Sequence, residues 1–331
     1  MKAVLLQRPG DPTTLSYQSY PDPQIQQPHQ LKIQIKAAGV NPIDTKLRSR
    51  GTFYPDQMPA ILGCDGSGVV VELGSEVTHF QIGDEVYFCR GGLGDIPGTY
   101  CDLTVLEAQY VAPKPQNLDF VQAAAAPLVL ITAWEALYDR AQIQPDHTVF
   151  VQGGSGGVGH VAIQLAKQRG ARVCTTVSTP QKARLAREWG ADQVIQYPIE
   201  SVEEAVRDWT EGVGVDVALD TLGGASLSQC FELARPYGRV VTLLAPASDT
   251  AWSTARTKNL TLSYELMLTP MLQGMAAAQQ HQVEILKRCK TWFEDQVLQV
   301  HVHKTFPLAA AADAHEFLER GGMTGKVVLI P

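Results

Sequence analysis

The sequence predicts an α/β fold in which a doubly wound parallel sheet is inserted into a β-rich domain. Residues 1–127 carry short strand patterns, and residues 128–264 alternate between strand and helix patterns. Residues 265–331 are expected to return to the first domain. At 331 residues the chain is long enough to bury two hydrophobic cores.

The first segment has the pattern of a compact domain of short strands. Residues 31–36 alternate between apolar and polar side chains, as a half-buried strand does, and further short apolar runs follow between glycines and prolines. The start of the chain, residues 1–6, resembles a first strand and carries no evident signal peptide. We therefore expect a cytoplasmic protein.

Residues 148–177 contain the most informative motif. A strand pattern leads into G-x-G-x-x-G at Gly154, Gly156 and Gly159, and a helix pattern and a second strand follow. This arrangement receives a dinucleotide pyrophosphate at the helix N-terminus. Gly154 is expected to permit the tight turn, Gly156 the approach of backbone to phosphate, and Gly159 the close packing of helix and strand. The predicted cofactor-binding residues of the loop are Gly154, Ser155, Gly156, Gly157, Val158 and Gly159.

The end of the second strand of this motif predicts which dinucleotide binds. An NAD site usually places Asp or Glu there to bind the ribose 2′-hydroxyl group, but no acidic residue occurs between Gly159 and Glu188. The strand is followed instead by Ser178 and Thr179, with Lys182 one helical turn later. Hydroxyl groups and an ammonium group suit a 2′-phosphate, so NADP(H) is the predicted cofactor. An ordinary solvated helix position is the alternative for Lys182.

The rest of the central segment continues the alternation. Thr179 and the proline after it have the pattern of a helix N-cap and first position, and Ser201 to Glu204 form a capping box. Strands are expected at 194–195, 215–219, 239–243 and 260–264, and helices at 180–189 and 225–234. With the two strands of the glycine motif this makes about six strands, as in a doubly wound sheet. In the tail we expect helices near 282–293 and 309–318 and strands at 298–303 and 325–330.

The composition excludes several classes of protein. A formal charge of −7, with 45% hydrophobic and 18% charged residues, is ordinary for a globular protein and gives no basic patch for nucleic acid. The longest apolar run, 123–134, is too short for a membrane span. None of the six cysteines forms C-x-x-C, so neither a zinc ribbon nor a redox pair is indicated. A small molecule is the expected partner.

Short motifs recur along the chain in a specific order. They lie at residues 37–44, 62–69, 83–86, 132–134, the glycine loop, 190–192, 220–224 and 325–329. In this order they resemble the medium-chain dehydrogenase/reductase superfamily, and most closely its zinc-independent NADPH:quinone oxidoreductase branch. The resemblance covers nearly the whole chain. It implies a Rossmann domain inserted into a GroES-like β domain, in agreement with the pattern of strands and helices.

The resemblance also shows where metal ligands are missing. The alcohol dehydrogenases of the superfamily carry a catalytic zinc on a Cys near the position of Asn41, a His near Cys64 and a Cys near residues 128–130. Here these positions hold an amide, a thiol and apolar side chains. One possible ligand is too few for Zn²⁺, which needs about three protein ligands. Of the cysteines for a second zinc, only Cys89 and Cys101 lie in the corresponding region. We therefore predict no metal site.

Without a Lewis acid, the chemistry expected is hydride donation from NADPH to an electron-poor acceptor, a quinone or an α,β-unsaturated carbonyl compound. The resemblance implies Asn41 and Tyr54 as catalytic residues: the Asn41 amide faces the reacting oxygen, and Tyr54 donates a hydrogen bond or a proton. Turn formation by Asn41 and simple packing by Tyr54 are the alternatives. Asp44 is expected to be a solvated loop residue rather than an acid of the active site. The remaining cofactor contacts implied are Thr132, beside the nicotinamide, and Tyr197 and Lys326.

Two other functions remain open at this point. One is an enoyl or alkenal reductase of metabolism, with the same fold and cofactor. The other is a non-catalytic NADPH-binding protein, as crystallin relatives of this branch are. A homodimer is expected from the resemblance and from the apolar strand at 260–262, whose open edge invites pairing.

Overall fold

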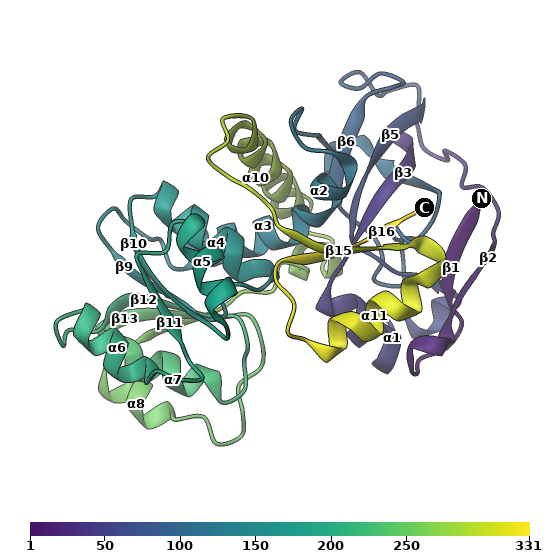
Figure 1. The fold of residues 1–331 in the computed structure, drawn as a ribbon. Helices are drawn as coiled ribbons and strands as arrows, with labels where there is room; N and C mark the ends of the chain where they lie inside the picture. Colours follow the sequence, from purple (N-terminus) through teal and green to yellow (C-terminus); the bar gives the residue numbers. More distant parts are fainter. The chain divides into compact units, whose positions relative to one another are not determined.

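The computed structural model describes all 331 residues, which form two compact units. One unit consists of Met1–Leu128 together with Leu268–Pro331, and the other is Val129–Met267. The two ends of the chain, purple and yellow in Figure 1, thus belong to the same unit. The predicted class, a doubly wound parallel sheet inserted into a β-rich domain, is confirmed.

The first unit, which we call the catalytic unit because the resemblance implies the catalytic residues there, is built around two β-sheets. The larger has seven strands, with β3 at its centre paired to β5, β7 and β16. Its strands are β3 (Gln30–Val40), β5 (Asp65–Leu73), β6 (Glu85–Cys89), β7 (Leu103–Glu107), β8 (Ala112–Pro113), β15 (Val302–Pro307) and β16 (Lys326–Ile330). The smaller sheet has the order β2 (Leu15–Ser19), β1 (Lys2–Leu6), β4 (Ala60–Ile61). Leu31, Ile33 and Ile35 of β3 are buried in the core, as their alternation predicts.

Helices of the catalytic unit bring polar side chains to the ends of these strands. They are α1 (Pro42–Arg50), α2 (Phe120–Ala125), α9 (Thr269–Leu272), α10 (Ala276–Glu294) and α11 (Ala311–Arg320). Helix α1 directly follows β3 and packs against α11. We did not predict α1, because Asn41 and Pro42 have the pattern of a turn. Proline also suits the first helical position, where it lies here.

The second unit, the Rossmann unit, contains one parallel sheet of six strands. The strand order is β11 (Gln193–Gln196), β10 (Arg172–Val177), β9 (Thr148–Val151), β12 (Val215–Asp220), β13 (Ala234–Thr242), β14 (Thr261–Tyr264). The order reverses between β9 and β12, which makes the carboxyl ends of these strands the expected ligand crevice. Strand β14 lies at the edge of the sheet, as expected for an open edge.

Helices cover both faces of this sheet. Figure 1 shows α4 (Gly157–Gln168) and α5 (Pro180–Glu188) on one face, and α6 (Val202–Trp209), α7 (Ser226–Leu233) and α8 (Trp252–Thr257) on the other. Phe150 and Phe231 lie in the core between the sheet and the second group of helices. Helix α3 (Pro127–Trp134) runs on into a π-helical stretch, Glu135–Arg140. No helix of the chain is both long and apolar enough to cross a bilayer.

The predicted elements of the tail differ from the structure mainly at one strand. We expected a strand at 298–303, but β15 begins at Val302, where pairing with β16 starts. Leu298 and Val300 are nevertheless buried. Their alternation with polar residues therefore reflects packing of an irregular segment, which has the same pattern as a strand.

Candidate active site

The glycine loop joins β9 to α4 and is shaped by close contacts. A Cβ atom on Gly154 would lie 2.0 Å from Thr175 Oγ1 of β10, and one on Gly159 would lie 2.3 Å from the carbonyl oxygen of Gly153. The positive φ of the turn, +67°, belongs to Gly153. The role predicted for Gly154 was therefore wrong in detail: Gly153 makes the turn and Gly154 permits the close approach of β10. Gly159 permits close packing of the helix against the loop, where we expected packing against the strand.

The first turn of α4 has the features of an anion site. The N–H groups of Gly157, Val158 and Gly159 have no acceptor in the structure, and the turn contains no acidic residue. A Cβ atom on Gly156 would meet only the Gly153 carbonyl oxygen, at 3.3 Å, so its backbone faces open space. With Ser155 beside it, this loop could hold a pyrophosphate by backbone donors and by the positive end of the helix dipole.

Three of the predicted 2′-phosphate contacts gather at the carboxyl end of β10. Ser178 and Lys182 are half-buried, and burial lowers the pKa of the Lys182 ammonium group. Thr179 is the N-cap of α5, accepting a hydrogen bond from the Lys182 N–H at 3.3 Å, as predicted. Tyr197, at the end of β11, is 55% exposed, and its N–H donates to the Val177 carbonyl oxygen at 3.2 Å. Hydroxyl and ammonium groups therefore surround this strand end.

The loop after β12 is a feature that we did not predict. Asp220, fully buried, accepts hydrogen bonds from the N–H groups of Leu222 and Gly223 and from the hydroxyl groups of Ser226 and Thr242, at 2.5–3.0 Å. It thereby fixes the loop that faces the glycine loop across the strand-order reversal. The sequence feature that could have predicted this loop is an aspartate at the end of a buried strand, followed three residues later by Gly-Gly. Thr132, also in this unit, is buried in α3.

The catalytic unit holds a second group of functional side chains, centred on Asn41. Asn41 is fully buried between β3 and α1, and its Nδ2 donates to Asp65 Oδ2 at 2.9 Å. Its Oδ1 accepts from the Lys326 ammonium group, which also lies 3.4 Å from Asp65 Oδ2. Because an ammonium group can only donate, this contact fixes which end of the amide is oxygen. The second N–H of Nδ2 has no acceptor in the structure.

Lys326, which was predicted to contact the cofactor, also belongs to this group. Its side chain is 3% exposed, and it pairs with Asp65, which no pattern in the sequence had indicated. Burial raises the pKa of Asp65, while the nearby Lys326 charge and the Asn41 amide oppose the rise. Asp65 Oδ1 accepts from the Leu128 N–H at 2.8 Å. We call Asn41, Asp65 and Lys326 the Asn41 cluster.

Asp44 belongs beside this cluster and is not the solvated loop residue that we expected. It is fully buried at the third position of α1, where its Oδ2 accepts from the backbone N–H of Asn41 at 2.8 Å. Burial, with a contribution from the neighbouring Asp65 charge, raises the pKa of Asp44 to about 7, and the Asn41 N–H hydrogen bond opposes that rise. The helix that begins at Asn41 turned this residue inward.

Tyr54 lies in the loop after α1, at the start of the short 3₁₀ turn Pro55–Gln57. The residue is half-buried, and its phenol group makes no hydrogen bond in the structure. The hydroxyl group of Tyr54 is therefore available to a ligand.

The residues at the family's zinc positions do not fit a metal. Asn41 is engaged by Lys326, Leu128 offers only its backbone, and Cys64 alone carries a soft donor. The chain contains no group of three or more His, Cys, Asp or Glu side chains placed to hold a metal ion. A catalytic zinc needs about three such ligands, so no step is assigned to one.

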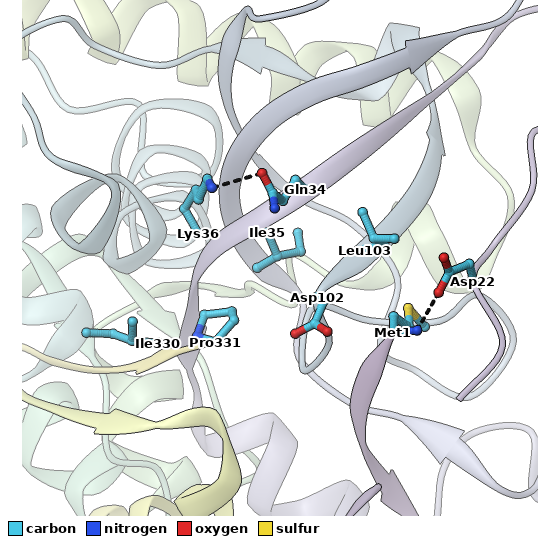
Figure 2. A pocket seen from close by; sticks show the side chains of 9 residues that line it. All are labelled: Met1, Asp22, Gln34, Ile35, Lys36, Asp102, Leu103, Ile330 and Pro331. Carbon is cyan, nitrogen blue, oxygen red and sulfur yellow. Dashed lines mark hydrogen bonds and ion pairs between the residues drawn. The ribbon is translucent and has the colours of Figure 1, made fainter. Parts of the chain in front are cut away.

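A surface cavity of about 560 Å³ lies elsewhere in the catalytic unit (Figure 2). Its walls come from β3, from residues 102–103 and from the two ends of the chain. In Figure 2 the Lys36 side chain points toward Gln34, its hydrogen-bond partner, and Met1 toward Asp22. None of the predicted site residues lines this cavity.

Comparison with known proteins agrees with the fold described above. The family model for the alcohol dehydrogenase GroES-like domain matches residues 27–116, and that for the zinc-binding dehydrogenase matches residues 189–329. The chain is 32% identical to the quinone oxidoreductase of Pseudomonas aeruginosa, over 97% of both proteins. It is 32% identical to a 2-haloacrylate reductase of Burkholderia sp, over 92% of the chain and 91% of that protein.

Among solved structures, the quinone oxidoreductase of Escherichia coli complexed with NADPH matches with a TM-score of 0.87 and 29% identity, over 100% of both chains. The match includes both units, and the family models cover parts of each. The chain therefore belongs to the medium-chain dehydrogenase/reductase superfamily, in its NADPH:quinone oxidoreductase-like branch.

Proposed function

We propose that this oxidoreductase uses NADP(H) to reduce a quinone or an α,β-unsaturated carbonyl compound without a metal ion. The observation that carries the proposal is the Asn41 cluster, in which an amide replaces the family's first zinc ligand and keeps one N–H free. NADPH supplies the hydride, that is, two electrons and the new hydrogen on the acceptor. The chain must then stabilise the negative charge that reaches the acceptor's oxygen.

The Asn41 cluster has the polarity for this task. Lys326 donates to the amide oxygen of Asn41, which draws electron density from the amide and makes its free N–H a stronger donor. Asp65 holds the other N–H at 2.9 Å and so orients the amide. A hydrogen bond to the forming oxyanion replaces the Lewis acid of zinc enzymes. The Tyr54 phenol, unbonded in the structure, is proposed as a second donor. One proton from solvent completes the reduced product.

The test is turnover with purified protein. NADPH oxidation should be accelerated by quinones, conjugated enones or alkenals, and not by simple saturated ketones, whose carbonyl carbon cannot pass charge along a conjugated system. Reduction of enones or alkenals alone would favour the enoyl or alkenal reductase, which the likeness to 2-haloacrylate reductase supports. Binding of NADPH with no turnover of any acceptor would leave a non-catalytic NADPH-binding protein and contradict the proposal.

The strand end of β10 predicts a measurable cofactor preference. A 2′-phosphate there would gain hydrogen bonds from Ser178 and attraction from Lys182, so NADPH should bind about tenfold or more tightly than NADH. Lys182→Ala should weaken NADPH about tenfold and barely change NADH. Ser178→Asp should reverse the preference by repelling the phosphate. Ser178 is the position to change, because Val177 is only 2% exposed and an acid there would be buried.

Dissociation constants from the quenching of protein fluorescence would check this. The matched control is Lys167→Ala, which removes a half-exposed lysine of the same unit that pairs with Asp192, at the other end of α4. Equal dissociation constants of the wild type for NADPH and NADH would contradict our assignment of the 2′-phosphate site.

Metal analysis should find no zinc bound in stoichiometric amount. The reason is the donor set at the family's zinc positions, which contains one thiol and no imidazole or carboxylate free to join it. Atomic absorption before and after dialysis against a chelator measures this. Retention of one zinc ion per chain, together with loss of activity on its removal, would show that another ligand set exists.

We also propose that the chain forms a homodimer. Strand β14 is the last strand of the Rossmann sheet, and its outer edge has no protein partner. Exposed Tyr264, at its end, adds apolar surface. Two such edges can pair across a two-fold axis. Light scattering at micromolar concentration should give twice the chain mass of 36.0 kDa, and a monomer would contradict this proposal.

A further inference from the structure

A series of hydrogen-bonded, buried polar groups in the catalytic unit has no role in the proposed function so far. The Tyr100 hydroxyl oxygen lies 3.1 Å from Asp44 Oδ2 and 3.2 Å from His315 Nε2. All three side chains are completely shielded from solvent. They come from α1, from the segment between β6 and β7, and from α11. Three segments distant in the sequence thus meet around one tyrosine hydroxyl group.

The two outer members of this series of polar groups, Asp44 and His315, each carry an atom without a hydrogen-bond partner. Asp44 Oδ1 and His315 Nδ1 are buried and make no hydrogen bond. Asp44 Oδ2, in contrast, accepts from both Tyr100 and the Asn41 N–H. Because two donors occupy Oδ2, a proton on Asp44 sits on Oδ1. The arrangement thus orients the carboxyl group against the start of α1 and leaves one oxygen free to gain or lose a proton.

The surrounding charges show which of these polar groups changes its ionisation state near neutral pH. Burial, together with the Asp65 charge, raises the pKa of Asp44 to about 7, although the hydrogen bonds from the Asn41 N–H and from Tyr100 and the Lys326 charge oppose the rise. His315 stays neutral, since burial, with Arg48 nearby, lowers its pKa to about 3. Arg48 itself is bonded to the Gly10 carbonyl oxygen and to the Glu319 carboxylate. The buried thiol of Cys64 also lies within the field of these carboxyl groups.

We propose that Tyr100, supported by His315, is a positioning residue for acceptor reduction: it holds Asp44 against Asn41 and sets the pH range in which the Asn41 cluster can stabilise an oxyanion. This rests on the proposed function. With Asp44 neutral, Asp65 and Lys326 balance each other. Ionised Asp44 adds one uncompensated negative charge beside the amide that faces the developing oxyanion. Like charges in a buried site repel strongly, so reduction should slow as Asp44 loses its proton.

The decisive comparison is Tyr100→Phe against Tyr87→Phe. Tyr87 is a second fully buried tyrosine of the same unit, whose hydroxyl group donates to the Leu286 carbonyl oxygen at 2.5 Å. Tyr87→Phe loses one buried hydrogen bond and Tyr100→Phe loses two, but only Tyr100 bonds to Asp44. In the wild type, kcat/KM for the acceptor should fall as pH rises through neutrality. In Tyr100→Phe this fall should occur at a pH about one unit higher, because the hydrogen bond that favours the Asp44 carboxylate is gone. Tyr87→Phe should leave it in place.

Two further variants complete the kinetic test. Asp44→Asn should abolish the fall with pH, and His315→Gln should move it in the same direction as Tyr100→Phe but less. NADPH dissociation constants should stay within about twofold in all of them, since none lies in the Rossmann unit. Identical pH profiles for Tyr100→Phe and Tyr87→Phe would show that Tyr100 makes only a structural hydrogen bond, and would overturn the proposal.

A measurement that needs no turnover separates this proposal from the proposed function. Infrared difference spectroscopy should show the C=O band of a protonated carboxyl group that titrates near neutrality and is missing in Asp44→Asn. Tyr100→Phe should shift this titration upward, and Tyr87→Phe should not. A wild type without turnover, but with this titration and shift, would reject the reaction and keep the positioning of Asp44. If the band is absent at every pH between 5 and 9, the positioning itself is overturned.

Discussion

Replacing Lys326 with methionine should lower the free energy of unfolding by about 3–5 kcal/mol at neutral pH, the usual cost of leaving one partner of a buried ion pair unpaired. Lys326 is 3% exposed and Asp65 is not exposed at all. Without the ammonium group, Asp65 keeps the Asn41 amide and the Leu128 N–H as hydrogen-bond donors, at 2.9 and 2.8 Å, but no positive charge. Methionine has a similar length, so the effect of lost packing is small. Urea unfolding followed by circular dichroism measures the change.

The matched control is Lys32→Met in β3 of the same unit. Lys32 is also largely buried, but its partner Glu72 is half-exposed, so water replaces the lost charge and the cost should stay below about 1 kcal/mol. The double variant Asp65→Asn with Lys326→Met should recover most of the lost stability, because no charge remains unpaired. Similar costs for Lys326→Met and Lys32→Met would contradict the buried ion pair.

The sign of the pH dependence follows from the same pair. In Lys326→Met nothing opposes the rise that burial causes in the pKa of Asp65, so the folded state holds its proton to higher pH than the unfolded chain. The cost of the substitution is then complete above the folded-state pKa and disappears as pH falls below the unfolded value near 4. The difference in stability between wild type and variant should therefore shrink on acidification.

The parts of the site that could be predicted from sequence are those made by local contacts. The glycine loop, the Thr179 N-cap and the Ser201 N-cap each depend on residues within one turn of each other, and the structure contains all three. Even there, the pattern could not predict which glycine adopts the positive φ, because Gly153 and Gly154 are adjacent and either could do so. The need for glycine at position 154 comes from Thr175, a residue of the neighbouring strand.

The Asn41 cluster could not be predicted, because its bonds join distant parts of the chain. Lys326 lies 285 residues from Asn41 and 261 from Asp65 along the sequence. A lysine that begins a C-terminal strand has no local feature to mark it as buried. Asp44 was misjudged for a related reason. Its burial follows from a helix that begins at a proline, and from Tyr100 and His315, which reach it from other segments.

Asn41→Ala should lower kcat/KM for the acceptor about a hundredfold and leave the dissociation constant of NADPH unchanged. Removing one preorganised donor to a developing oxyanion costs about 10²–10³ in rate in enzymes that use such donors. The free N–H of Asn41 is the proposed donor, and alanine offers none. Stopped-flow single turnover, with NADPH bound before the acceptor is added, separates this step from cofactor binding and product release.

The control must account for the other bonds that alanine breaks, since Lys326 and Asp65 also lose the amide. Asn117→Ala serves for general stability, because Asn117 is an amide of the same unit whose Nδ2 donates to the Phe293 carbonyl oxygen at 2.6 Å. Asn41→Asp keeps the size of the side chain and an acceptor for Lys326, but replaces the donor with a charge that repels an oxyanion. The single-turnover rate of Asn41→Asp should therefore be lower than that of Asn41→Ala if the N–H donor matters. It should be higher if only the hydrogen bond with Lys326 matters. A single-turnover rate equal to that of the wild type in both variants would remove Asn41 from the reaction.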